Sequence, residues 1–331
     1  MDNLKTETKR ESESRYSRQT ILPEIGENGQ QKLEKATIAI VGIGALGTVA
    51  VELLTRAGIR QLILIDRDII EDTNLQRQML FTEKDIGRSK AVVAAEKIKE
   101  INGTSTITVH AIHLSSKNID TLNTADLILA CTDNQQTRFL INDYCKKNKT
   151  PWIYAAAIRT EGYVMPIFPD QACLRCFTKE AELETCATAG VLGTITTVIA
   201  ALQTTLAIKM ILKQPIEQKL LHIDVWNNHF KSLTIKQSPN CPTCQGKYDY
   251  FSKSEDTPMT IKFCSTNRFQ IKGRQKDFPT LIKHWQKIDV VESDSETLRF
   301  KNIILFKDGR ALIKAATAEE ALSVYSEWVG N

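Results

Sequence analysis

The sequence predicts an α/β protein with a doubly wound, mostly parallel sheet, followed by a small C-terminal α+β module. Three observations support this prediction. An apolar strand pattern runs into Gly42, Gly44 and Gly47, spaced Gly-x-Gly-x-x-Gly, and a helical pattern follows. Two later apolar runs end in acids, at Asp66 and Asp133. Strand and helix patterns alternate through about five units, as in a Rossmann-like fold.

The composition is that of an ordinary globular protein. Its 331 residues leave room for one large domain and one small one, and 42% of them are hydrophobic. The net charge of +4 is spread over 43 basic and 39 acidic residues, so no nucleic acid partner is expected. The longest apolar stretch, Val191 to Leu212, is interrupted by threonines, glutamine and lysine, so no membrane association is expected either.

The N-terminal segment and the cysteines bear on the compartment. Residues 1–14 are charged and lack an apolar core, so we expect a disordered tail and no secretory signal. Eight cysteines in such a chain favour thiols or metal ligands over a disulfide framework. A cytoplasmic location is therefore expected.

The first elements lead into the glycine motif. Arg18 lies three residues after another arginine on one helical face, either as a phosphate ligand or as solvated surface charge. A polar helix is expected to about residue 34, then a strand at residues 37–41 and a helix at residues 46–56 that Gly58 ends. The glycine turn and the free N–H groups of that helix suit a bound phosphate.

The strand at residues 61–66 and the polar loop after it favour a nucleotide. Asp66 suits a ribose, which both a dinucleotide and ATP carry. The polar segment that continues to Gln78 is unnecessary for a dehydrogenase. Within it, Asn74 can donate hydrogen bonds to phosphate oxygens and Arg77 can pair with them.

Two further charged residues are candidates for binding phosphates or their metal ion. Lys90 opens a predicted helix, a position that the helix dipole disfavours unless an anion binds there; a surface lysine is the alternative. Asp133 lies near Asp66, because the carboxyl ends of parallel strands meet at one edge, and it can hold Mg²⁺ on phosphates. The other elements expected in this domain are helices at residues 90–101 and 135–147 and strands at residues 107–111, 127–133, 152–156, 219–226 and 230–235.

Two Cys-x-x-Cys pairs are the most specific motif in the chain. They are Cys173 with Cys176 and Cys241 with Cys244. Each pair presents two thiolates from one turn, and together they complete a closed tetrahedral zinc site with a structural role. A redox role is the alternative, but two copies favour zinc.

The remaining cysteines of this domain have different surroundings. Cys131 and Cys145 lie on apolar faces and are expected in the core. Cys186 lies in a polar loop before an apolar helix at residues 194–212, either activated by the helix start or a bystander. The helix is apolar nearly all round, which predicts burial in the sheet layers and across a dimer interface.

The composition changes after the last Cys-x-x-Cys pair. Residues 248–258 are polar and are expected to form a linker, and residues 259–331 a separate α+β module. Its expected strands span residues 260–264, 268–271, 297–301, 303–306 and 311–313, and its helices residues 278–287 and 317–328.

Together these motifs resemble the ThiF/MoeB/HesA family, the bacterial relatives of ubiquitin-activating enzymes. The resemblance covers residues 15–245 and is specific as a combination. It rests on Arg15-x-x-Arg18-Gln19, the glycine motif, Asp66-x-Asp68, Asn74-Leu-Gln-Arg77-Gln78, Lys90, Cys131-Thr-Asp133-Asn134, the two cysteine pairs and Cys186-x-x-x-Gly190.

The resemblance implies that residues 15–247 form an ATP-binding adenylyltransferase domain. Such a domain adenylates the C-terminal glycine of a ubiquitin-fold sulfur carrier protein with MgATP. Asp66 would bind the ribose, Asp133 would coordinate Mg²⁺, and Arg18 would reach the active site of a partner subunit in a homodimer. The triphosphate would be held by Asn74, Arg77 and Lys90, and the rest of the nucleotide site would be formed by Gly42, Gly44, Gly47, Asp68, Gln78 and Asn134.

Two further implications concern sulfur transfer and the branch of the family. Cys186 matches a loop cysteine that can join covalently to the carrier in the thiamine branch, and a sulfur donor protein is possible. The C-terminal module resembles an extension found on thiazole-branch proteins of Gram-positive bacteria. This favours a ThiS-like carrier over the MoaD-like carrier of molybdenum cofactor biosynthesis. The rival classes are an NAD-dependent oxidoreductase and an inactive zinc-stabilised scaffold.

Overall fold

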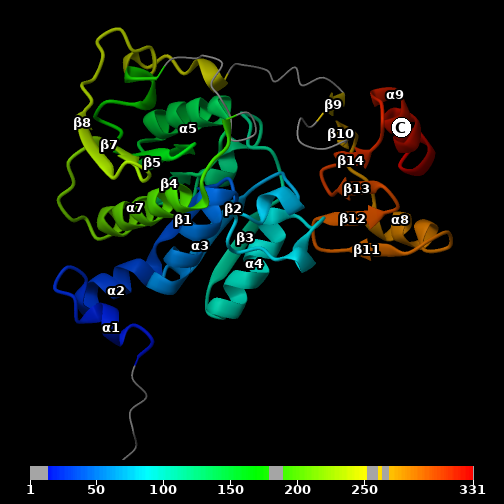
Figure 1. Ribbon diagram of the computed structural model, residues 1–331, viewed down its shortest axis with the longest axis horizontal. Coiled ribbons are helices and arrows are strands. Elements are labelled where there is room, and N and C mark those ends of the chain that lie inside the picture. The colour runs from blue at the N-terminus through cyan, green and yellow to red at the C-terminus, as the bar shows by residue number, and fades with distance from the viewer. Residues whose placement is uncertain (1–13, 179–188, 252–259, 263–267, 331) are drawn as a thin grey trace, which may run out of the picture.

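The computed structural model describes residues 14–178, 189–251, 260–262 and 268–330. These residues form two sheets with separate cores, a larger N-terminal one and a smaller one that lies beside it (Figure 1). Residues 1–13 of the predicted tail at residues 1–14 lie outside the described residues, as do Cys186 and Cys264.

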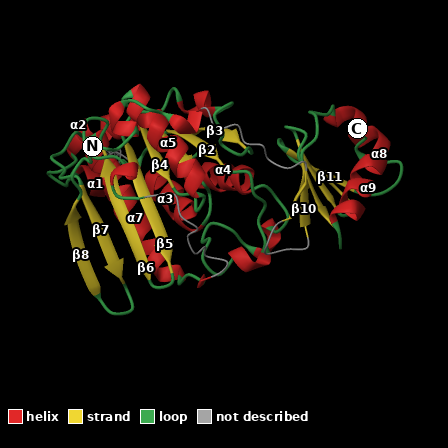
Figure 2. Ribbon diagram, turned by 90° about the horizontal axis from the view of Figure 1, so that it is seen from above, coloured by secondary structure: helices red, strands yellow, loops and turns green. Residues whose placement is uncertain are grey.

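The larger sheet has eight strands in the order β3-β2-β1-β4-β5-β6-β7-β8. The strands from β1 to β5 pair in parallel, and β6, β7 and β8 extend the sheet in antiparallel fashion (Figure 2). This confirms the mostly parallel, Rossmann-like prediction. The strands are β1 (Thr37–Val41), β2 (Gln61–Ile65), β3 (Thr106–His110), β4 (Leu127–Ala130), β5 (Trp152–Ile158), β6 (Glu161–Ile167), β7 (Lys219–Asp224) and β8 (His229–Thr234).

Helices cover both faces of this sheet, which is why its central strands are apolar throughout. One core gathers side chains from α2, α3, α4 and α7, and the other gathers them from α5. The α-helices are α1 (Ser17–Thr20), α2 (Gly26–Lys35), α3 (Ala45–Ala57), α4 (Lys90–Ile101), α5 (Gln135–Asn148) and α7 (Gly193–Ile211). The 3₁₀ helices are η1 (Asp72–Asn74), η2 (Glu83–Asp85), η3 (Ile119–Leu122), η4 (Leu174–Cys176), η5 (Thr243–Gln245) and η6 (Asp249–Phe251).

Helix α7 is long and apolar enough to cross a membrane by length and composition alone. In this chain it packs on β5, β6 and α3, with Ile195, Ile199, Gln203 and Ala207 buried at every fourth position. Among the residues that the structure describes, only one face of the helix is thus covered. Burial of its other faces by a second copy of the chain stays a prediction.

Both cysteines expected in the core are there. Cys131 is buried, donates a hydrogen bond to Gln203 Oε1 at 3.2 Å, and has its pKa raised to about 12 by burial. Cys145 is also fully buried, and burial raises its thiol pKa strongly. Neither thiol is suited to ionise, so both serve packing.

The smaller sheet is antiparallel, in the order β11-β12-β13-β14-β10-β9. One of its faces forms an apolar core with α8 and α9, which contains Trp285, Phe300 and Tyr325. The elements are β9 (Thr260–Lys262), β10 (Arg268–Ile271), α8 (Phe278–Trp285), β11 (Val291–Ser293), β12 (Thr297–Phe300), β13 (Ile303–Phe306), β14 (Ala311–Lys314) and α9 (Ala318–Trp328).

The main differences between the structure and the sequence predictions concern three strands, one turn and the linker. Strands β6 and β11 were not anticipated, and β4 ends at Ala130, so Asp133 lies in the loop beyond it. The β5–β6 turn contains Arg159 at φ 53° in place of the glycine that usually marks a hairpin. Residues Asp249–Phe251, inside the predicted linker, form η6, and Tyr250 stacks on Phe139 in the core that α5 forms with the larger sheet.

Gly47→Ala tests how tightly the glycine motif is packed. A Cβ at Gly47 would lie 2.0 Å from the carbonyl oxygen of Gly42, so the turn must distort. We expect the midpoint of thermal unfolding to fall by more than about 5 °C. The matched control is Gly103→Ala, whose Cβ would meet nothing nearer than 3.9 Å. Equal midpoints for the two variants would contradict the tight packing.

Candidate functional site

A cavity of about 590 Å³ opens at the carboxyl ends of β1, β2 and β4. Strand β1 lies between β2 and β4. The chain adds β2 and β3 on one side of β1 and then crosses to add β4 and β5 on the other side. Ligands of open α/β sheets bind at such a position. The structure brings ten of the predicted site residues into the cavity wall: Gly42, Gly44, Asp66, Asp68, Asn74, Arg77, Gln78, Lys90, Asp133 and Asn134.

The glycine motif forms the floor of the cavity. Gly42 has φ 94°, and a Cβ there would lie 2.7 Å from the backbone nitrogen of Thr132. Gly44 precedes α3, and no side chain within the described residues caps that helix, which leaves its first N–H groups to an anion. Gly47 does not line the cavity but packs on Gly42. Its role is therefore to close the strand–helix turn.

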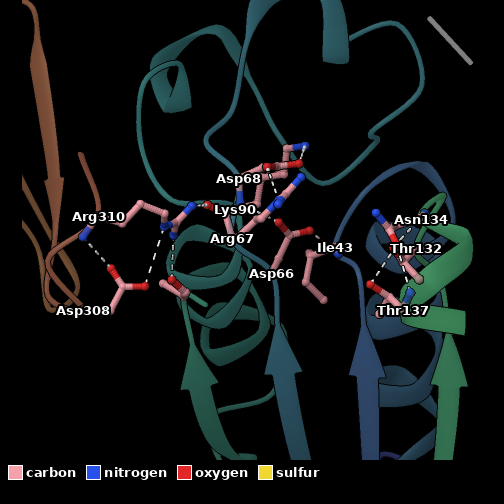
Figure 3. A network of polar contacts seen from close by, with 11 residues as sticks. Ile43, Asp66, Arg67, Asp68, Lys90, Thr132, Asn134, Thr137, Asp308 and Arg310 are labelled. Carbon is pink, nitrogen blue, oxygen red and sulfur yellow. Dashed lines mark hydrogen bonds and ion pairs between the residues drawn. The ribbon is translucent and has the colours of Figure 1, made fainter. Parts of the chain in front are cut away.

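Asp66 connects the glycine turn to the loop after β2. Its Oδ2 accepts a hydrogen bond from the backbone N–H of Ile43 at 2.6 Å, and its Oδ1 accepts one from the backbone N–H of Asp68 at 2.7 Å (Figure 3). Burial raises the pKa of Asp66, and the nearby Asp68 carboxylate raises it further. The two hydrogen bonds and Lys90 act in the opposite direction.

Lys90 supplies the opposite charge. Only 7% of the residue is exposed, so it is not a surface lysine, and its Nζ lies 3.6 Å from Asp68 Oδ2 (Figure 3). Burial lowers the pKa of Lys90, but the charges of Asp68, Asp66, Asp133 and Glu71 outweigh it and the net shift is upward. Lys90 thus stays protonated at the start of α4, where acids offset the unfavourable helix dipole.

The phosphate-binding residues suggested by the sequence lie on a tight turn. In η1 the side chain of Asn74 accepts a hydrogen bond from the backbone of Glu71 at 3.2 Å. Arg77 follows and donates to the carbonyl of Thr73 at 2.9 Å.

Asp133 is exposed at the cavity mouth, and Asn134 caps α5 by accepting from the N–H of Thr137 at 2.8 Å. The carboxylate of Asp133 is therefore accessible to a cation.

The residues that line the cavity include three that the sequence did not single out and that bear on its role. Arg138, on α5, is buried, donates to the carbonyl of Ala155 at 3.1 Å, and lies over the ring of Tyr154. Nothing in its sequence context separates it from a surface arginine. Arg268 and Leu312 come from the C-terminal sheet, whose position local sequence patterns do not reveal.

Arg18 does not line the cavity of its own chain. The neighbouring Gln19 donates to the carbonyl of Ala57, at the end of α3, whereas the cavity lies at the start of that helix. The 13 residues of α3 span about 20 Å, so α1 lies near the amino ends of the strands, at the opposite side of the domain from the cavity. A role for Arg18 in nucleotide binding would therefore require a second chain.

The four cysteines of the Cys-x-x-Cys pairs come together, as the sequence predicts. Their sulfur atoms all lie within 4.8 Å of one another, with Cys173 and Cys241 at 3.5 Å and Cys176 and Cys244 at 3.6 Å. A tetrahedral ion at about 2.3 Å from four thiolates would separate them by about 3.8 Å. The cluster is therefore able to hold a metal ion.

Helix α5 supports both halves of the cluster. Asn142 accepts a hydrogen bond from the N–H of Leu174, between the first two cysteines, at 2.9 Å. Asp143 accepts from the hydroxyl of Thr243, between the second two, at 2.6 Å, and burial raises the pKa of Asp143. Both knuckles are thus fixed to the helix that begins at the cavity.

Comparisons with known proteins agree with this geometry. Residues 16–243 match a family model described as the ThiF family. A sulfur carrier protein ThiS adenylyltransferase of Bacillus subtilis is 31% identical over 337 aligned positions, which cover 96% of this chain and 99% of the relative. A protein of the same name from Escherichia coli is 38% identical over 240 positions, covering 70% and 95%. The solved structure of E. coli MccB with ATP superposes at a TM-score of 0.63 with 27% identity, covering 71% of this chain and 75% of that one.

The sulfur cluster predicts that the purified chain carries about one metal ion, because four thiolates complete one closed site. Elemental analysis of protein purified under reducing conditions measures this directly. Cys244→Ser is expected to lose most of the metal and to unfold at a lower temperature. Cys145→Ala, a buried cysteine outside the cluster, is the control and is expected to keep the metal. A metal-free wild-type protein would contradict the assignment.

Proposed function

This chain belongs to the ThiF family, and on that premise we propose that it uses ATP to adenylate the C-terminal glycine of a ubiquitin-fold sulfur carrier protein. The observation that carries the proposal is the match to a ThiS adenylyltransferase over 96% of this chain, C-terminal module included. We therefore infer that the carrier is ThiS-like and serves thiamine thiazole biosynthesis. The ATP-bound MccB structure supports the choice of nucleotide.

The residues of the cavity suit this chemistry. The carrier's terminal carboxylate attacks the α-phosphorus of ATP, the bond to the bridging oxygen breaks, and pyrophosphate leaves with its electron pair. The product is an acyl-adenylate. No general base is required because the nucleophile is already an anion. Charge grows on the phosphate oxygens, and Arg77 and the protonated Lys90 stabilise it where it develops.

We assign the remaining nucleotide contacts by position. Asp66 lies at the end of β2 and is proposed to accept hydrogen bonds from the ribose, while Asn74 and Arg77 face the triphosphate. Asp133 is proposed to hold Mg²⁺, since an exposed carboxylate is a suitable ligand for that ion. The bound cation would neutralise charge on the leaving pyrophosphate.

The metal of the sulfur cluster is proposed to be zinc in a structural role. Four thiolates leave no open position for chemistry, and their spacing suits a tetrahedral ion. The cluster joins the segment after β6 to the segment after β8. It would thereby hold the antiparallel edge of the sheet against α5.

A homodimer in the cytoplasm is proposed as the working form. Arg18 lies far from the cavity of its own chain, near the amino ends of the strands, and this supports a contribution to the cavity of a second chain. The partly uncovered helix α7 supports an interface with such a copy. Cys186 is proposed to bind the carrier covalently after adenylation: its thiolate attacks the acyl carbon of the acyl-adenylate, a thioester forms, and AMP leaves with the electron pair of the broken acyl–oxygen bond.

The proposal predicts ATP–pyrophosphate exchange that depends on a carrier ending in Gly-Gly. The organism's own ThiS-like and MoaD-like proteins should be assayed side by side, and the ThiS-like protein is expected to support the faster exchange. Preference for the MoaD-like protein would move the chain to the molybdenum cofactor branch. Absence of exchange with either carrier would overturn the proposed function.

Two variants sharpen the exchange assay. Arg77→Ala is expected to slow exchange by about 10²–10³-fold, since one donor to the developing charge is lost. Arg56→Ala, which removes a surface arginine paired with Glu52, is the control and should be unaffected. Cys186→Ala should exchange normally but fail in sulfur transfer; loss of exchange would contradict that division of roles.

A further inference from the structure

One face of the C-terminal sheet packs on the nucleotide-binding domain. Cross-strand partners share a face, and the partners on this one include Ile304 and Leu312. Together with Phe306 they form an apolar cluster with Ile69, in the loop after β2, and Ala111, just after β3. The other face of the sheet holds the module's own core. The module therefore docks at the mouth of the nucleotide cavity.

Arg310 fixes this docking. It is 7% exposed, and its guanidinium lies 3.8 Å from the ring centroid of Phe306. It donates hydrogen bonds to the carbonyl of Arg67 at 2.7 Å (Figure 3) and to the carbonyl of Ala111 at 2.9 Å. Arg67 lies between the two acids of the cavity. Burial raises the pKa of Asp68, but Lys90, Arg67 and Arg310 outweigh it, and the pKa is lowered overall. Arg310 thus ties the module to the charged loop both sterically and electrostatically.

Arg268 lies on the same face, nearer the phosphate-binding segment. It begins β10, opposite Lys314 on β14, and lies two residues before Gln270, the partner of Leu312. Its side chain lines the nucleotide cavity. It also lines a smaller neighbouring cavity together with Glu71 and Thr73, just before Asn74.

The surroundings of Arg268 favour an anion. Its guanidinium is half-buried and makes no hydrogen bond or ion pair with the described residues. Burial lowers its pKa, and the charge of Glu71 only partly opposes the shift. A partly desolvated cation without a bonded carboxylate is costly to maintain. A phosphate in the cavity would offset that cost through charge-assisted hydrogen bonds.

We propose that Arg268 is a substrate-binding residue that contacts the β- and γ-phosphates of ATP, so that the C-terminal module completes the nucleotide site. The inference rests on the proposed function and extends it, since it gives the module a role in the adenylation site itself. Arg268 lies beside the segment that carries Asn74 and Arg77, which argues for the outer phosphates. The carrier's carboxylate is the competing anion, and binding measured without carrier separates the two.

The test compares the affinities of the full-length chain for ATP and AMP by calorimetry, without carrier. Arg268→Ala is expected to weaken ATP binding by about 10- to 100-fold and to leave AMP binding unchanged, because only the outer phosphates lose a partner. If the alanine variant folds poorly, Arg268→Gln replaces it in the test. This variant keeps most of the side chain's length and is expected to show the same loss of ATP affinity. Arg299→Ala is the matched control, an arginine on the same sheet face that does not line the cavity.

Two results would overturn the inference. The first is unchanged ATP affinity in the Arg268 variants; a raised KM for the carrier in the same variants would then assign Arg268 to the carboxylate. The second is an equal loss of ATP and AMP affinity, which would indicate general damage to the cavity. Each of these is distinct from failure of the proposed function, in which the wild-type chain would bind no ATP and catalyse no exchange.

Discussion

The two hydrogen bonds accepted by the carboxylate of Asp66 hold the site together. One comes from the glycine turn at Ile43 and the other from Asp68, so a single side chain sets the spacing between two loops from different strands. Such an acid is costly to bury and needs a compensating cation nearby. Lys90 supplies that charge from the start of α4. The geometry of the cavity therefore depends on this charged cluster as well as on the glycines.

The glycine motif by itself does not identify the nucleotide. Gly42 and Gly44 shape a turn that accepts any phosphate, in a dinucleotide or in ATP. The distinction comes from the positive side chains that line the cavity, which are Arg67, Arg77, Lys90 and Arg138 from the larger domain and Arg268 from the smaller. A ring of cations from separate segments suits a triphosphate whose charge increases during the reaction.

The elements and site residues that could be predicted from the sequence are those that a local pattern encodes. The bounds of β1 and α4 were predicted to the residue, because apolar periodicity is strong there, and the four clustered cysteines were identified from spacing. Strand β6 was missed because its hairpin turn lacks a glycine. Arg268 and Arg310 were missed for a different reason. Their roles depend on docking a sheet about 200 residues away in sequence, which no local period encodes.

The central claim is that this cavity binds ATP and not a dinucleotide. Equilibrium dialysis of the full-length chain with labelled MgATP and labelled NAD, in the absence of carrier, tests it most directly. The account predicts saturable binding of ATP, no saturable binding of NAD, and no displacement of ATP by excess NAD. Saturable binding of NAD that ATP fails to displace would contradict it.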